Sequence, residues 1–141
     1  MHPYLAARGL SEETVRHFGL GFCERGVMRG RIGIPIHDEG GKLVAYAGRW
    51  AGSDDDLPDG EGKYKFPSGF KKSLVLYNLH RVSPTAERVI VVEGFFGHQA
   101  VHQAGDPNVV ALMGSTISKE QRALLVARFR EVVILLDGDE A

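Results

Sequence analysis

The sequence predicts an α/β protein in which a mixed α+β amino-terminal segment is followed by a parallel α/β sheet. Three apolar runs, at 89–92, 109–112 and 132–136, alternate with two stretches of helical character. This alternation is typical of a parallel sheet with right-handed crossovers. Upstream, isoleucine recurs at every second position of 32–36, which indicates a strand with one buried face.

The amino-terminal segment is expected to contain two short helices and a β-hairpin. The first helix covers 4–8, and the second begins after Ser11, whose hydroxyl can cap it, and ends at Gly19. Residues 31–36 and 42–50 pair as a hairpin through a Gly-rich turn. Pro35 lacks an amide N–H, so its strand is expected at the sheet edge, or with this nitrogen turned away from a neighbouring strand.

The helices of the last third are predicted over 95–104 and after Ser118, which is a suitable N-cap. His98 and His102 lie four residues apart on the first of these helices. That spacing is compatible with a metal ligand pair, but no Glu-Xaa-Xaa-His frame surrounds it, so a pair on the helix surface is the favoured interpretation.

Composition limits the classes of function. Hydrophobic residues make up 43% of the 141 residues, enough for the core of one domain or two small subdomains. The formal net charge of -1 excludes a uniformly basic nucleic-acid binder, so any such affinity must come from a local patch. A single cysteine excludes an internal disulfide and a Cys-rich zinc site. Without a long apolar span or a signal peptide, a cytoplasmic location away from membranes is expected.

Three carboxylates follow the predicted parallel strands. Glu93 comes directly after the first apolar run, and Asp137 and Asp139 come directly after the third. Carboxyl ends of parallel strands share one sheet edge, so these side chains are expected to meet. Clustered carboxylates repel one another without a cation, and their hard oxygens suit Mg²⁺ or Mn²⁺, the ions of phosphoryl and nucleotidyl transfer. An ordinary turn or a phosphorylatable aspartate remains an alternative for the Asp-Gly-Asp segment.

Basic residues interleave with aromatic residues upstream of these carboxylates. Phosphates pair with cations and bases stack on aromatic rings, so this pattern predicts single-stranded nucleic-acid binding. The alternative is a solvated strand edge beside aromatic residues of the core. The residues concerned are Arg25, Arg29, Arg31, Arg49, Lys63, Tyr64, Lys65, Phe66, Phe70, Lys71 and Lys72.

Across nearly its whole length, the order of these motifs resembles the catalytic core of bacterial DnaG-type DNA primases. Such a core has a basic amino-terminal subdomain and a toprim domain, here expected at 1–87 and 88–141. The matching segments are 4–22, Arg29 to Ile36, Tyr46 to Arg49, Lys63-Tyr64, Phe70 to Ser73, Leu76 to Leu79, Val91 to Phe95, Met113 to Thr116 and Leu136 to Asp139. The basic motif separates primases from other toprim proteins.

The resemblance implies metal-dependent synthesis of RNA primers on single-stranded DNA during replication. Glu93, Asp137 and Asp139 would bind two Mg²⁺ or Mn²⁺ ions. Ribonucleoside triphosphates are the implied substrates, a replicative helicase is a partner through regions outside this chain, and the location is the cytoplasm with the nucleoid. The implied template and nucleotide path is lined by Arg29, Arg31, Arg49, Lys63 and Lys72.

Three departures from the family pattern stand out. Gly97 occupies the position where the family usually has Asp, four residues after the motif Glu. The sequence ends two residues after Asp139, and no zinc-binding domain precedes it, so a truncated chain without activity of its own is one expectation. Two other hypotheses use the same residues: a toprim nuclease of a mobile element or defence system, and a non-catalytic nucleic-acid-binding module.

Overall fold

The computed structural model describes residues 1–137, which form two compact units. The first unit comprises Met1–Ile36 and Leu43–Phe70. The second comprises His37–Lys42 and the chain from Lys71 onward. The tip of the predicted hairpin is therefore part of the second unit, and the predicted domain boundary after residue 87 stays a prediction.

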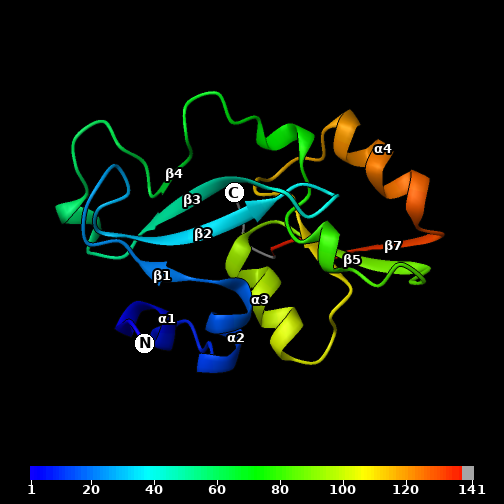
Figure 1. Cartoon of the computed structure of the whole chain (residues 1–141), viewed down its shortest axis with the longest axis horizontal. Coiled ribbons are helices and arrows are strands. Elements are labelled where there is room, and N and C mark those ends of the chain that lie inside the picture. The colour runs from blue at the N-terminus through cyan, green and yellow to red at the C-terminus, as the bar shows by residue number, and fades with distance from the viewer. Residues whose placement is uncertain (138–141) are drawn as a thin grey trace. The chain divides into compact units, whose positions relative to one another are not determined.

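The first unit is built on a four-stranded sheet with strand order β1-β2-β3-β4. Both α-helices lie on one side of this sheet (Figure 1). β1 pairs antiparallel with β2, and β3 pairs antiparallel with β4. The elements are α1 (Pro3–Ala7), α2 (Glu12–Phe18), β1 (Gly21–Phe22), β2 (Arg31–His37), β3 (Leu43–Trp50), the 3-10 turn η1 (Asp54–Asp56) and β4 (Tyr64–Lys65).

Local sequence explains these elements. Ser11 Oγ accepts a hydrogen bond from the Thr14 amide at 3.2 Å, and Gly19 ends α2 with φ of 66°, so the predicted caps are confirmed. The alternating isoleucines of β2 are fully buried, as predicted. β2 lies inside the sheet rather than at its edge, but β1 begins at Gly21, opposite Gly33. Pro35 therefore lies beyond the end of β1, where no ladder bond is lost.

The second unit contains a three-stranded parallel sheet with order β6-β5-β7, which confirms the predicted parallel architecture. Figure 1 shows α3 and α4 on opposite sides of this sheet, as two right-handed crossovers in opposite directions require. The elements are η2 (Lys72–Leu74), η3 (Leu79–Arg81), β5 (Arg88–Val92), α3 (Phe95–Gln103), β6 (Val109–Ala111), α4 (Lys119–Arg128) and β7 (Glu131–Ile134).

The core of the second unit surrounds β5, the central strand. Val89 and Val91 of β5 are fully buried and belong to an apolar cluster with Leu125 and Phe129 of the α4 region. Within residues 1–137, β7 has a neighbouring strand on one side only, and Ile134 is half exposed. Among the described residues, no helix is long and apolar enough to cross a bilayer.

Candidate functional site at the carboxyl edge of the parallel sheet

The three parallel strands bring separate chain segments to one edge. β5 runs into Glu93, β6 runs into Met113 and β7 runs toward Asp137. The Met113 amide donates to the Glu93 carbonyl at 2.8 Å, and the Leu135 amide donates to the Val91 carbonyl at 2.8 Å. These bonds continue the sheet pairing past the strand ends, so the edge is held by backbone rather than by mobile side chains.

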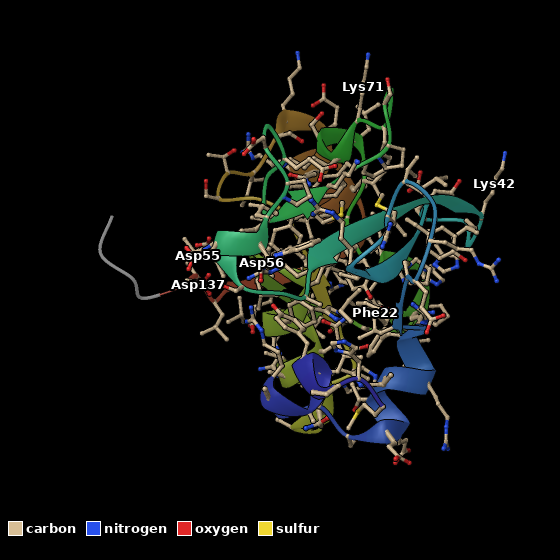
Figure 2. All side chains as sticks on the ribbon, turned by 90° about the vertical axis from the view of Figure 1, so that its left-hand side faces the viewer. Phe22, Lys42, Asp55, Asp56, Lys71 and Asp137 are labelled. Carbon is tan, nitrogen blue, oxygen red and sulfur yellow. The ribbon has the colours of Figure 1, made fainter. Side chains whose placement is uncertain are left out.

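Glu93 and Asp137 meet at this edge. Glu93 Oε1 accepts a hydrogen bond from the Asp137 amide at 3.3 Å. Glu93 is partly buried, whereas Asp137, the last described residue, lies at the surface (Figure 2). The predicted third carboxylate, Asp139, lies outside the described residues. Within residues 1–137, no three His, Cys, Asp or Glu side chains lie close enough together to hold a metal ion.

Lys72 lies on the same edge. A β-carbon added at Gly114 would lie 3.5 Å from Nζ of Lys72. Gly114 follows Met113, whose amide is bonded to the Glu93 carbonyl, so the ammonium group lies near the acidic edge. Met113 itself adopts a positive φ of 62°, an uncommon conformation for a residue with a side chain. Sequence reasoning placed Lys72 in the nucleotide path, but gave no reason why Gly114 should lack a side chain.

Gln121 is a positioning residue that the sequence analysis did not single out. Its side chain is almost fully buried, and its Nε2 donates to the carbonyls of Val75, Leu112 and Lys72 at 2.9, 3.1 and 3.3 Å. Its Oε1 accepts from the Ser118 amide at 3.1 Å, completing a capping box. One side chain thus joins the Lys72 segment, the end of β6 and the start of α4. The capping-box spacing from Ser118 was the available signal.

Helix α3, which begins after Glu93, is anchored by buried polar groups. Gln99 Nε2 donates to the Tyr77 hydroxyl at 2.9 Å, and burial raises the pKa of Tyr77. His98 Nε2 lies 3.1 Å from the Val109 carbonyl. His98 is fully buried, so the prediction of a surface pair with His102 is wrong for His98. The helical period alone does not reveal which face packs against β6.

Gly97 lies in the first turn of α3 and is exposed. No atom lies within 4 Å of a β-carbon added at this position. The family's Asp would therefore fit here without displacing a neighbour. Steric exclusion does not explain why this chain has Gly at this position.

The predicted basic residues of the first unit differ sharply in exposure. Arg31 is only 1% exposed, and its guanidinium donates to the carbonyls of Gly48, Lys63 and Gly62 at 3.2, 3.0 and 2.9 Å. The guanidinium also lies 3.6 Å from the Glu61 carboxylate. In this conformation Arg31 joins β2, β3 and the segment before β4, and its groups are not available to a strand of nucleic acid. A direct binding role for Arg31 stays a prediction, which this geometry does not favour.

Arg49 and Lys63 keep partial access to solvent. Cζ of Arg49 lies 5.5 Å from the ring centroid of Tyr4 and 5.4 Å from that of Tyr64. Burial raises the pKa of Tyr64, so its hydroxyl stays neutral. Lys63 is exposed and pairs with Asp54 at 3.5 Å, a contact that solvent screens strongly. Arg29 is exposed, and among the described residues its side chain makes no ion pair or hydrogen bond.

Comparison with known proteins agrees with this architecture. Residues 87–141 match the toprim domain family. A DNA primase of Clostridium acetobutylicum is 30% identical over 98% of this chain and 28% of its own length. The solved zinc-binding and RNA polymerase domains of Aquifex aeolicus primase align at TM-score 0.83 and 26% identity, covering 97% of this chain and 42% of that one. A DnaG primase catalytic domain solved with single-stranded DNA aligns at TM-score 0.75 and 25% identity, covering 96% and 55%.

The parallel sheet and the family match therefore define residues 87–141 as a toprim domain. Among toprim proteins, the chain resembles the catalytic core of DnaG-type DNA primases along nearly all of its length. The chain spans less than a third of the curated relatives it matches.

Proposed function

We propose that this chain is the catalytic part of a DnaG-type primase, which synthesises RNA primers from ribonucleoside triphosphates on a single-stranded DNA template. The supporting observation is the hydrogen bond between Glu93 and the Asp137 backbone, which joins the ends of β5 and β7. Carboxylates carried by the ends of two neighbouring strands that are far apart in the sequence, with Lys72 on the same edge, form an arrangement suited to nucleotidyl transfer.

Glu93 and Asp137 fit a divalent ion, and Asp139 is proposed as the third ligand. Glu93 is partly exposed and Asp137 is exposed, so both carboxylates are open to an ion with water in its remaining positions. Oxygen donors of this kind suit Mg²⁺ or Mn²⁺, and two ions are proposed. Bound there, the ions would neutralise negative charge on the transferring phosphate and activate a hydroxyl nucleophile.

The remaining roles fall to basic groups. The Lys72 ammonium and the amino-terminal end of α3, which begins directly after Gly94, would attract the phosphates of the incoming nucleotide. Arg29, Arg49 and Lys63 are proposed to bind the template, whereas Arg31 would hold their supporting strands in place. The solved relative with single-stranded DNA supports a DNA-binding role for this architecture. Location with the nucleoid, and a helicase contact made through other regions, follow from this proposal.

Primer synthesis by the purified protein tests the proposal. We expect oligoribonucleotides to form on a single-stranded template with ribonucleoside triphosphates and Mn²⁺ or Mg²⁺, and Asp137→Asn to abolish them. Glu87→Gln is the matched control, because Glu87 is an exposed carboxylate just before β5, at the opposite end of this strand from Glu93.

Binding of Mn²⁺, followed by electron paramagnetic resonance, gives a readout that does not depend on turnover. It should weaken in Asp137→Asn and persist in Glu87→Gln. A folded protein that binds no Mn²⁺ and makes no product would count against the proposal. Metal-dependent cleavage of nucleic acid without nucleotides would favour the nuclease hypothesis. No separate feature of the described residues favours a nuclease over a primase.

A further inference from the structure

A hollow of about 570 Å³ lies on the surface of the first unit. Its walls include Trp50 at the end of β3, Arg29 from the loop before β2, and Glu61 and Lys65 from the β4 region. We propose that this hollow seats one base of a single-stranded nucleic acid against the indole of Trp50, while Arg29 binds a neighbouring phosphate. The inference rests on the proposed function and assigns one contact of its template path.

The indole of Trp50 is fixed in place before any ligand binds. Its Nε1 donates to the Ser53 carbonyl at 2.8 Å. A β-carbon at Gly30 would lie 2.6 Å from Cζ3 of the indole, and one at Gly52 would lie 3.1 Å from Nε1. Both glycines therefore let the backbone approach the ring closely. The ring remains partly exposed, so it offers an ordered aromatic surface that loses little side-chain entropy on binding.

The charges around the hollow single out Arg29. Lys65 is neutralised by Glu61, whose carboxylate lies 2.5 Å from Lys65 Nζ and 3.6 Å from Arg31. The hydrogen bond from Lys65 lowers the pKa of Glu61, so this carboxylate stays charged. A phosphate would be repelled from the Glu61 wall and attracted to Arg29, which has no side-chain partner among the described residues. A bound strand matches this uneven distribution of charge when its phosphate contacts Arg29 and its base lies against the Trp50 ring.

An aromatic surface beside an unpaired cation is the pairing that single-stranded nucleic acid requires. Stacking on a ring tolerates any base, because every base has an aromatic face. A free nucleoside triphosphate carries the same two chemical groups, so the test must separate a strand from a nucleotide.

Trp50 is the only tryptophan of the sequence, so its fluorescence reports this site directly. The protein is titrated with a short oligothymidylate, while the anisotropy of a labelled strand follows binding independently. We expect Trp50 emission to be quenched in proportion to the bound strand. An abasic strand of equal length should bind more weakly and leave the emission unchanged. Quenching by ATP but not by the strand would overturn the assignment to a strand.

One pair of variants tests the base contact, and a second pair tests the phosphate contact. Trp50→Leu should weaken strand binding roughly 5- to 100-fold, and Trp50→Phe less, because the stacking surface is lost or reduced. Arg29→Ala should weaken binding and lower its salt dependence. Arg16→Ala is the control, because Arg16 is an exposed arginine of the same unit that neither lines the hollow nor belongs to the predicted basic segment.

The wild-type titration decides the matter even if a Trp50 variant fails to fold. Saturated strand binding with unchanged Trp50 emission would overturn the inference and leave the proposed function standing. Equal quenching by the abasic strand would also overturn it, since no base would then be needed. Absence of any strand binding would count against both the inference and the primase proposal.

Discussion

Replacing Gln121 with Ala should destabilise the second unit and loosen the Lys72 segment. The Gln121 amide donates to three backbone carbonyls, and its oxygen closes the capping box of α4. Ala keeps the helix propensity of the position, but leaves the carbonyls of Val75 and Leu112 without this donor. The loss therefore falls on the contacts between segments and not on the helix itself.

The size of the effect follows from the geometry. The two shorter bonds, at 2.9 and 3.1 Å, are each worth about 1 kcal/mol net, and more where the abandoned carbonyl stays buried. Loss of one half of the capping box adds about 0.5–1 kcal/mol. We therefore expect the free energy of unfolding to fall by about 2–4 kcal/mol.

Urea unfolding followed by far-ultraviolet circular dichroism measures this change, and hydrogen exchange at Leu76 and Leu112 locates it. Arg122→Ala, an exposed neighbour on α4, is the control and should change stability by less than about 0.5 kcal/mol. Gln121→Glu keeps the acceptor but directs a carboxylate at three carbonyls, so it should be worse than Ala at neutral pH. A Glu variant as stable as the wild type would refute the assigned hydrogen bonds.

Three further predictions concern other sites. Arg31→Met should lower the free energy of unfolding by about 2–4 kcal/mol, measured by Trp50 fluorescence in denaturant, because three carbonyls lose a buried donor; unchanged stability would mean that Arg31 is not structural. Gly97→Asp should fold normally, because no atom lies near a β-carbon at this position, and it should tighten Mn²⁺ binding, because the Asp side chain adds a carboxylate. Titration calorimetry measures the affinity, and an equal or weaker affinity would contradict this prediction. Burial, followed by the charge of Arg81, lowers the pKa of His80 to about 4. In the unfolded chain the imidazole takes up its proton near pH 6.5, so the contribution of His80 to the free energy of unfolding should be complete above that pH and be lost as the pH falls toward 4. His80→Phe should flatten this pH dependence of the free energy of unfolding. An identical pH profile in the variant would exclude His80 as the source.

The His80 prediction depends on the groups that surround the ring. The ring centroid of His37 lies 4.5 Å from that of His80, and the charge of Asp38 partly opposes the effect of Arg81. Nδ1 of both histidines is buried without a hydrogen-bond partner among the described residues. Protonation of either ring would therefore place a charge where little compensates it.

The order of elements and the acidic edge followed from the sequence by itself. Apolar runs of β-branched residues and the caps at Ser11 and Ser118 are local signals, so the hairpin, the three parallel strands and these helix starts were located nearly to the residue, whereas the two-residue strands β1 and β4 were not predicted. Because parallel strands present their carboxyl ends together, Glu93 and Asp137 were correctly expected to meet. These features need only chain order and the chirality of the crossovers.

Tertiary structure alone decided which polar side chains turn inward. Arg31 and Arg29 are two residues apart in one basic motif, yet the first is buried on three carbonyls and the second faces solvent. His98 was predicted at the helix surface, but it is fully buried, and Gln121, for which no prediction was made, is buried on three carbonyls of other segments. Hydrophobic periodicity identifies the apolar face of an element. It carries no information about a carbonyl from a distant segment, and such carbonyls determine whether a buried polar group is satisfied.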